Sequence, residues 1–303
     1  MEAIKSADLV KVYGDGVKAL QGINISIKEG ELYTLLGPNG AGKTTFLKII
    51  STQLMPTSGK AYVLGCNVVS EAPEIHRHIS VVPQDVATYG IYTPWEYAYY
   101  FARLRGVPKQ EAKKTAEKAL RAVGLWDLRK RTCANLSGGE KRRAIIASAL
   151  SSYADVLMLD EPTSGLDAIA RRNVWSALRQ MVKEGKTILL TTHNMEEAEM
   201  VSDRLAIINR GQVIAEGSPE TVKGLVAEKY RVVLEGETTR FPICKNNYGM
   251  TIGDKHIVYV ENESEAASLM KKALKTGLRA HVSPITLEDV FVKLAGGFDN
   301  ESS

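Results

Sequence analysis

The sequence of 303 residues contains no apolar run that approaches the roughly 20 residues needed to cross a bilayer as a helix. It has only three cysteines, Cys66, Cys133 and Cys244, and their wide spacing excludes both a disulfide framework and a zinc-binding pattern. The opening segment, residues 1–14, lacks the apolar centre of a signal peptide. We therefore expect a globular protein with reduced thiols that is made in the cytoplasm and stays there.

A strong net charge of either sign is also missing. The formal charge of +4 is small for this length, so it does not demand a nucleic-acid partner, and we expect none. The same mild positive charge suits a surface that lies near anionic lipid. Hydrophobic residues make up 44% and charged residues 24% of the chain, which is typical of a globular protein with one large domain and a small one.

The hydrophobic pattern changes after about residue 30. Residues 1–30 alternate short strand-like runs with turns, which predicts an antiparallel β layer. Beyond them, runs that are apolar at every position occur at Leu32–Leu36, Val156–Leu159 and Thr187–Leu190. Such runs are typical of buried parallel strands, and helical patterns lie between them. The sequence therefore predicts an α/β fold with a mixed sheet and an N-terminal antiparallel β layer.

Two further regions complete the predicted organisation. Residues 85–150 are mainly helical in pattern, and Thr93-Pro94 combines a capping residue with a proline suited to the first helical position. We place the boundary of the large domain at residues 1–228. Residues 229–297 form a small α+β accessory domain in this interpretation, and residues 298–303 form a disordered tail.

A phosphate-binding loop is predicted between the first buried strand and the helix that follows it. Its glycines let successive backbone N–H groups point at phosphate oxygens, and the helix N-terminus favours an anion. Lys43 would reach the β- and γ-phosphates of ATP, the Thr44 hydroxyl would ligate Mg²⁺, and Thr45 would lie near the α-phosphate. A glycine-rich turn without a ligand is the alternative. The candidate ATP-binding residues of this loop are Gly37, Pro38, Asn39, Gly40, Ala41, Gly42, Lys43, Thr44 and Thr45.

Two carboxylates follow the second buried strand directly. Ligands bind at the carboxyl ends of strands in open α/β sheets, so we expect Asp160 and Glu161 to lie at a ligand-binding site. Asp160 suits a Mg²⁺ site that faces Thr44, and Glu161 suits a general base that polarises the attacking water. An acidic pair after an apolar run is usually only solvated, but the phosphate loop upstream favours the functional interpretation. The two motifs together predict binding and hydrolysis of Mg-ATP.

Five more motifs resemble those of the ABC ATPases, in that family's order, over about residues 1–225. Gln84 resembles the glutamine of the Q-loop, residues 164–167 resemble the D-loop with Asp167, and His193 resembles the switch histidine. Tyr13 resembles the aromatic residue that stacks on adenine. The signature sequence of the family resembles the run Leu136, Ser137, Gly138, Gly139 and Glu140. The family usually has glutamine at the fifth position.

The resemblance implies roles for these residues. The signature would contact the γ-phosphate of an ATP held by a second ATPase subunit, and we expect a homodimer. Gln84 would contribute to catalysis and to the Mg²⁺ site, and His193 would bridge the γ-phosphate and Glu161. An ordinary helix N-cap is the alternative for Ser137, and plain packing is the alternative for Tyr13. A carboxylate at position 140 is expected to face away from phosphate or to pair with Lys141 or Arg143.

Aromatic residues after the Q-loop suggest a partner. Tyrosine and tryptophan are favoured at interfaces, which suits Tyr89, Tyr92 and Trp95 to a protein partner. The resemblance to ABC transporters implies that this region receives the coupling helix of a membrane-embedded permease subunit. Packing inside the helical region is the alternative for these three, and it is our expectation for Tyr99 and Phe101. The stretch 284–291 resembles the end of ATP-binding subunits from the drug-, antibiotic- and sodium-exporting branch.

The leading hypothesis is therefore an ATP-hydrolysing subunit of an ABC exporter, peripheral on the cytoplasmic face of the cell membrane. One alternative is a soluble ABC ATPase acting in translation or DNA maintenance, and another is a cassette that binds ATP without turnover. The single cassette and the intact acidic pair argue against these two. The transported substrate cannot be read from this chain, because in ABC transporters the membrane subunit selects it.

Overall fold

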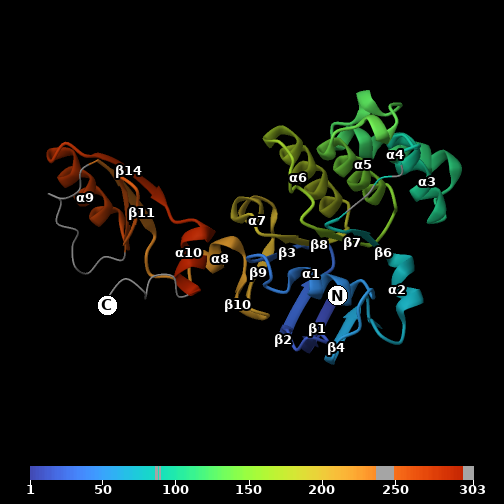
Figure 1. The fold of residues 1–303 in the computed structure, drawn as a ribbon, viewed down its shortest axis with the longest axis horizontal. Coiled ribbons are helices and arrows are strands. Elements are labelled where there is room, and N and C mark those ends of the chain that lie inside the picture. The colour runs from blue at the N-terminus through green and yellow to red at the C-terminus, as the bar shows by residue number, and fades with distance from the viewer. Residues whose placement is uncertain (86–87, 89, 237–248, 296–303) are drawn as a thin grey trace. The chain divides into compact units, whose positions relative to one another are not determined.

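The computed structural model describes residues 1–85, 88, 90–236 and 249–295. The chain forms two compact units, Met1–Ala215 and Glu216–Ser303 (Figure 1). The first unit thus ends before residue 228, and the functional boundary at that residue stays a prediction. The predicted tail, 298–303, and Cys244 lie outside the described residues. No helix in the described ranges is long and apolar enough to span a membrane.

The first unit opens with an antiparallel sheet. Strand β1 (Glu2–Val12) pairs with β2 (Lys18–Lys28) on one side and with β4 (Ser58–Val63) on the other, and β5 (Cys66–Asn67) completes the order β2-β1-β4-β5. Every second residue of β2 is apolar and buried between Ile23 and Ile27, which gives this sheet one face toward the core. The predicted antiparallel β layer is confirmed.

The second sheet of this unit has six strands in the order β10-β9-β3-β8-β7-β6. Strands β3, β6, β7, β8 and β9 pair in parallel. The apolar runs of β3, β7 and β8 predicted this for those three strands. A turn of two residues joins β9 to β10, and such a short connection fits an antiparallel pair and hence a mixed sheet. The strand bounds are β3 Leu32–Leu36, β6 Ile79–Val82, β7 Val156–Asp160, β8 Thr187–Thr192, β9 Arg204–Asn209 and β10 Gln212–Gly217.

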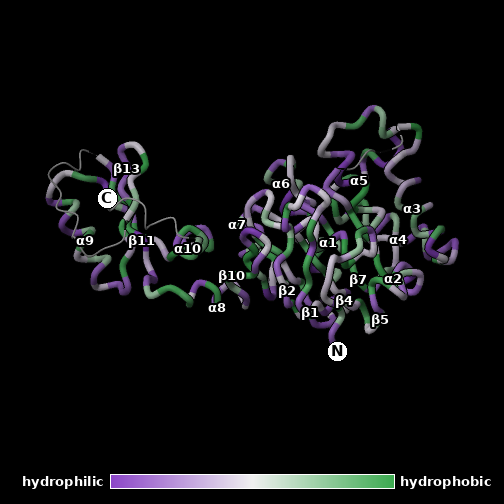
Figure 2. Tube along the Cα trace, turned by 60° about the horizontal axis from the view of Figure 1, so that its bottom comes forward, coloured by the Kyte–Doolittle hydropathy of each residue, from purple (hydrophilic) through white to green (hydrophobic). Residues whose placement is uncertain are grey.

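Two hydrophobic cores lie on the two faces of this sheet. Along β7, Val156 and Met158 pack with α1 (Lys43–Ile50) and the antiparallel layer, whereas Leu157 and Leu159 pack against helices on the opposite face. Figure 1 shows α1 on one side of the sheet and α5 and α6 on the other, and Figure 2 shows hydrophobic stretches along the strands inside this unit. Each fully buried Leu or Val contributes about 1.5–3 kcal/mol to the free energy of folding.

Helices α3 to α6 lie between β6 and β8 in the order of the chain. Thr93 caps α3 through a reciprocal bond pair with Glu96, so the start signal read from the sequence is confirmed. Leu120, Ile146 and Leu178 share one core, which fixes α4, α5 and α6 to one another. The helix bounds are α2 Ala72–His78, α3 Pro94–Leu104, α4 Lys109–Ala122, α5 Gly138–Leu150, α6 Ala168–Lys183 and α7 Met195–Val201.

The second unit contains a four-stranded antiparallel sheet in the order β12-β13-β11-β14. Its core packs the sheet against α9, and Asp289 at the start of α10 accepts a hydrogen bond of 2.9 Å from the Tyr259 hydroxyl. Strand β12 is short and mostly exposed, and we did not predict it. The bounds are α8 Pro219–Lys223, β11 Tyr230–Glu235, β12 Gly249–Ile252, β13 Lys255–Val260, α9 Glu263–Lys275, β14 Arg279–Pro284 and α10 Leu287–Leu294.

Candidate nucleotide-binding site

Three segments that are far apart in the sequence meet at one edge of the six-stranded sheet. Because β3, β7 and β8 run in parallel as neighbours, their carboxyl ends lie side by side. The phosphate loop follows β3, the acidic pair ends β7, and His193 follows β8. The sheet topology thus brings together side chains from positions 43, 161 and 193.

The loop after β3 needs glycine at two positions where other parts of the chain come close. A Cβ atom on Gly37 would lie 2.1 Å from the Ile208 carbonyl oxygen, and one on Gly42 would lie 2.4 Å from that of Ala19. Gly42 also has φ +108° and precedes α1 without any side-chain cap. The first N–H groups of α1 are therefore not capped by a side chain, which is the arrangement that anions bind.

Lys43 is buried at the start of α1, with 5% of its surface exposed. Its Nζ donates to the Gly37 carbonyl at 2.8 Å and to the Pro38 carbonyl at 3.1 Å, and it lies 3.7 Å from Glu161 Oε1. Burial lowers the pKa of Lys43, and the charges of Glu161 and Asp160 oppose that shift. The ammonium group is thus fixed by backbone oxygens within the loop.

Thr44 and Asp160 form an oxygen-rich corner. The Thr44 hydroxyl donates to Asp160 Oδ1 at 3.2 Å, and the Thr191 hydroxyl donates to the same oxygen. Mg²⁺ in nucleotide sites usually takes one or two carboxylate or hydroxyl ligands from the protein and the remainder from phosphates and water, so this donor set fits it. The described part of the chain holds no cluster of three His, Cys, Asp or Glu side chains, as an all-protein metal cage would need.

Glu161 adopts an unusual backbone conformation, with φ +46°. A residue other than glycine in the left-handed region is strained by about 1–2 kcal/mol. Its N–H donates to the Thr191 carbonyl at 3.0 Å, and its side chain is buried with Oε2 at 3.0 Å from His193 Nδ1. The carboxylate is therefore held between Lys43 and His193 by the chain around it.

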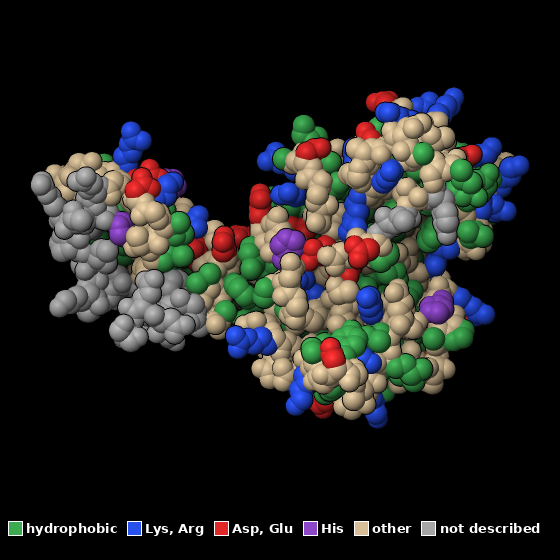
Figure 3. Space-filling view, viewed as in Figure 1, with side chains coloured by type: hydrophobic (Ala, Val, Ile, Leu, Met, Phe, Trp, Pro, Cys, Tyr) green, Lys and Arg blue, Asp and Glu red, His purple; other side chains and the backbone are tan. Residues whose placement is uncertain are grey.

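A cavity of about 470 Å³, here called the loop cavity, lies over the phosphate-binding loop. Tyr13 stands at its rim, 38% exposed, and its hydroxyl is 3.2 Å from that of Thr45. We did not predict Lys18, Gln21 or Arg210, which also line it and which belong to no short motif. Figure 3 shows acidic, basic and histidine side chains gathered at the middle of the visible face of this unit. The sequence-predicted residues that line the cavity are Tyr13, Asn39, Gly40, Ala41, Gly42, Lys43, Thr44, Thr45, Gln84 and Glu161.

The signature residues lie apart from this cavity. Gly138 and Gly139 line a second cavity of about 670 Å³, here called the signature cavity, and Gln84 lines both cavities. Ser137 caps α5 and accepts the N–H of Glu140, while its own N–H donates to Glu140 Oε2 at 2.7 Å. Bonds from Ser137 lower the pKa of Glu140. The capping box thus engages the Glu140 carboxylate, and the expectation that it faces away from phosphate or pairs with Lys141 or Arg143 stays a prediction.

Asp167 is also an N-cap. It begins α6, and its Oδ1 accepts the N–H of Ala170 at 2.8 Å. This backbone bond lowers the pKa of Asp167. The geometry thus gives Asp167 a structural role, and its proposed role in the D-loop stays a prediction.

The aromatic residues near α3 divide between surface and interior. Tyr92 is 40% exposed, whereas Trp95 is half-buried and stacks on Tyr99 with ring centroids 4.8 Å apart. Phe101 was expected in the core but is 37% exposed. Tyr89 lies outside the described residues.

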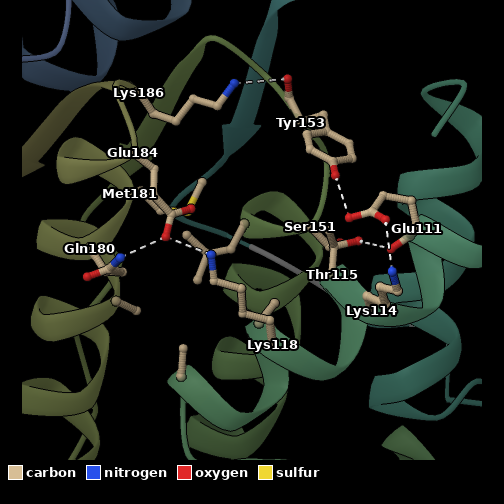
Figure 4. A pocket seen from close by; sticks show the side chains of 14 residues that line it. Glu111, Lys114, Thr115, Lys118, Ser151, Tyr153, Gln180, Met181, Glu184 and Lys186 are labelled. Atoms are coloured by element: carbon tan, nitrogen blue, oxygen red, sulfur yellow. Dashed lines mark hydrogen bonds and ion pairs between the residues drawn. The ribbon is translucent and has the colours of Figure 1, made fainter. Parts of the chain in front are cut away.

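Another cavity, of about 240 Å³, lies between α4 and α6 and is here called the α4–α6 cavity (Figure 4). Lys118 points at Glu184, with 2.6 Å between Nζ and Oε1, and the Tyr153 hydroxyl donates to Glu111 at 2.9 Å. Its charged groups thus satisfy one another. This cavity contains none of the motif residues.

Arg142 on α5 is the residue near the site that motif reasoning missed. It donates to the carbonyls of Asp160 at 2.8 Å and Glu161 at 2.6 Å, and also to that of Gln84. Arg142 stands near three other basic residues, at positions 131, 141 and 143, and so carries no distinguishing sequence signal. Only the fold reveals its contacts.

Comparison with known proteins identifies the family. The sequence profile described as "ABC transporter" matches residues 20–164. The daunorubicin/doxorubicin resistance ATP-binding protein DrrA of Streptomyces peucetius is 40% identical over 221 residues, which cover 73% of this chain and 67% of that protein. The Nod factor export ATP-binding protein I of Burkholderia orbicola is 39% identical over 294 residues, or 94% of each chain. The chain therefore belongs to the ABC transporter family, as an ATP-binding subunit with ATPase activity.

Solved structures agree with this assignment. The ATP-binding cassette MJ0796, determined as a dimer bound to ADP and Pi, matches with a TM-score of 0.65 and 28% identity over 71% of this chain and 98% of that one. The protein cbiO1 of Clostridium perfringens, part of the ABC transporter complex cbiONQ, matches with a TM-score of 0.66 and 31% identity over 74% of this chain and 91% of that one. The predicted α/β fold with an ABC ATPase core is confirmed.

Proposed function

We propose that this chain powers an exporter whose membrane-spanning subunit is a separate protein, and that it acts as a homodimer on the cytoplasmic face of the membrane. The observation that carries the proposal is the carboxylate of Glu161, which lies 3.7 Å from Lys43 Nζ and 3.0 Å from His193 Nδ1. Export is supported by relatives named for drug resistance and for Nod factor export. The second relative matches 94% of this chain, so the likeness extends into the second unit.

In the proposed reaction, the loop N–H groups and Lys43 bind the phosphates of ATP, and Tyr13 packs on the adenine. Thr44 and Asp160, with Gln84, would hold Mg²⁺, which neutralises charge on the β- and γ-phosphates. Glu161 accepts hydrogen bonds from the attacking water and polarises it as a general base. His193 lies 3.0 Å from Glu161 and can orient both that carboxylate and the γ-phosphate.

The homodimer is proposed because the two cavities of one chain are separate. The loop cavity and the signature cavity share Gln84, but Ser137, Gly138 and Gly139 do not line the loop cavity. The Ser137 hydroxyl accepts one bond as an N-cap and can still donate its own hydrogen to a phosphate. A second copy would bring these groups to the γ-phosphate held by Lys43 of the first copy.

Glu161→Gln is the decisive test. We expect turnover to fall by about 100- to 10,000-fold, the usual contribution of a general base, while ATP stays bound. Light scattering after gel filtration should then detect a dimer with saturating Mg-ATP and a monomer with ADP. Glu184→Gln, which changes a partly exposed carboxylate at the C-cap of α6, is the matched control and should hydrolyse ATP normally. Wild-type turnover by Glu161→Gln, or a persistent monomer with ATP, would overturn the proposal.

For the membrane subunit we propose a docking site that includes Tyr92, Trp95 and the exposed apolar side chains of α3. Tyr100, Phe101 and Leu104 are 48%, 37% and 86% exposed, which is unusual for a row of apolar residues on one short helix. Because Trp95 is half-buried, we expect it to support this surface from beneath and Tyr92 to contact the partner directly.

A double variant tests this docking site. Tyr92→Ala with Leu104→Ala should abolish transport into vesicles that contain the membrane subunit, because loss of central interface residues costs about 2 kcal/mol or more of binding. Basal ATPase activity should be unchanged, since neither residue lines the loop cavity. Tyr153→Ala, an exposed tyrosine beside the α4–α6 cavity, is the control. Normal transport by the double variant would refute the docking site.

A further inference from the structure

The guanidinium group of Arg142 uses all five of its N–H donors on backbone carbonyls. Nη2 donates to the carbonyls of Asp160 at 2.8 Å and Glu161 at 2.6 Å, and Nε donates to that of Pro162 at 3.2 Å. Nη1 donates to the carbonyls of Pro83 at 3.4 Å and of Gln84. Arginine has five such donors in a rigid planar fork, so every donor of this side chain is satisfied.

Three of these carbonyls surround the residue proposed as the general base. The carbonyls on both sides of the Glu161 Cα, those of Asp160 and Glu161, are drawn to the same Nη2 atom. Glu161 has φ +46°, a conformation that persists only where surrounding contacts hold it. On the other side, its N–H donates to Thr191. Arg142 and Thr191 thus fix the two peptide groups that flank Glu161, and hence the direction of its carboxylate.

The remaining two carbonyls belong to the segment that follows β6. Gln84 lines both the loop cavity and the signature cavity, and Arg142 also lines the latter. Arg142 itself lies in the second turn of α5, the helix that Ser137 caps. The Arg142 side chain therefore joins three parts of the chain: the start of α5, residues 83–84 (the Gln84 segment) and the backbone of Glu161.

We propose that Arg142 is a positioning residue that transmits the position of the Gln84 segment and of α5 to the carboxylate of Glu161. This proposal rests on the role proposed above for Glu161. When the five bonds are made, Glu161 faces Lys43 and His193. A displacement of α5 or of the Gln84 segment would release the peptide groups around Glu161 and misdirect its side chain. The rate of hydrolysis would then depend on contacts made outside the loop cavity.

The next residue on α5 provides a matched control. Arg143 donates through Nη1 to the carbonyls of Val123 at 3.1 Å and Gly124 at 3.0 Å. It is the same residue type, on the same helix, and it also binds backbone oxygens. Those oxygens follow α4, so these bonds tie α5 to the end of α4, whereas those of Arg142 reach the backbone of Glu161 and Gln84. Loss of stability alone should affect both arginine variants, whereas loss of positioning should affect one.

The first experiment compares Arg142→Gln and Arg143→Gln in steady-state ATPase assays and in ATP binding by calorimetry. We expect Arg142→Gln to lower kcat by about 10- to 100-fold with unchanged ATP affinity, because small misplacement of a catalytic group costs about that much. Arg143→Gln should retain kcat even where its melting temperature falls. Arg142→Lys should recover part of the rate, since its three donors can meet some of the five carbonyls. Equal loss of kcat in both glutamine variants would overturn the proposal.

The second experiment combines Arg142→Gln with Glu161→Gln. If Arg142 acts through Glu161, the double variant should hydrolyse ATP no more slowly than Glu161→Gln alone, because there is no carboxylate left to position. A further loss of rate equal to that of the single Arg142→Gln variant would overturn the positioning role. A wild-type rate for Glu161→Gln alone would instead contradict the proposed function, so the two failures are distinguishable.

Discussion

The loop cavity and the α4–α6 cavity are both lined by lysine, tyrosine and glutamate, but these side chains differ in exposure and in what positions them. Over the loop, Lys43 is 5% and Glu161 6% exposed, and backbone groups of the loop and of β8 hold them. In the α4–α6 cavity, the Lys118 side chain is 60% exposed and its charge is met by Glu184 (Figure 4). Buried charges that bonds to the backbone position beside a cavity can bind a ligand, even where they also lie near one another, whereas exposed charges that only pair with each other serve the fold.

The largest expected difference concerns ATP affinity. Lys43→Ala should weaken ATP binding by about 10- to 150-fold, because a hydrogen bond to a charged group contributes about 1.5–3 kcal/mol. Lys118→Ala should bind ATP like the wild type, since its partner Glu184 is not in the loop cavity. Isothermal titration calorimetry measures both values. Equal affinities would remove the distinction between the two cavities.

A smaller difference is expected for the two tyrosines. Tyr13→Ala should weaken ATP binding by about fivefold, corresponding to about 1 kcal/mol, the lower end of the range for stacking of an aromatic ring on a base, since this ring is partly exposed. Tyr153→Ala should leave ATP binding unchanged. A titration with GTP in parallel sharpens the test, because stacking tolerates either base. If Tyr13→Ala binds ATP normally, Tyr13 serves packing alone.

The smallest effect is expected in stability. The hydrogen bond from Lys118 lowers the pKa of Glu184 from its ordinary value of 4.5. A lowered carboxyl pKa contributes stability above the unfolded-state value, and that contribution is lost as the pH falls through the folded-state value. Lys118→Met should therefore destabilise the first unit by about 0.2–1 kcal/mol at neutral pH, as for other exposed pairs.

Urea unfolding at neutral and at acid pH measures this contribution. The difference between wild type and Lys118→Met should shrink as the pH is lowered below about 4.5. A difference between wild type and Lys118→Met that grows in acid would contradict the assigned direction.

The strands and the loop could be predicted because their signals are local. Leu32–Leu36 is apolar at every position, which favours a strand buried on both faces, and it lies fully buried. Helix α9, Glu263–Lys275, lies in the region predicted as α+β, and its N-cap Asn262 directly precedes it in the sequence. Strand β12 was missed because it is short, exposed and supported only by its partner β13.

Contacts between distant segments had no such signal. Nothing in the local sequence distinguishes Arg142 from Arg143, although one binds the carbonyls around Glu161 and the other those after α4. The exposure of Phe101 was mispredicted for the same reason, since an apolar residue in a helix faces whichever side its neighbours leave open. The burial pattern of α3 depends on α5, which begins more than thirty residues later.

By itself, the sequence determined the chemistry of each part: glycines for close approach at Gly37 and Gly42, an ammonium group at Lys43, and carboxylates at Asp160 and Glu161. Residue type and short spacing carry that information. Hydrogen-bonding capacity belongs to each type of side chain, and glycine is the residue type that adopts a positive φ without strain. Only the tertiary structure decided that these parts meet, through the parallel order of β3, β8 and β7. It also decided that Arg142 holds Glu161, since hydrogen bonds across the fold require the complete packing of α5 on the sheet.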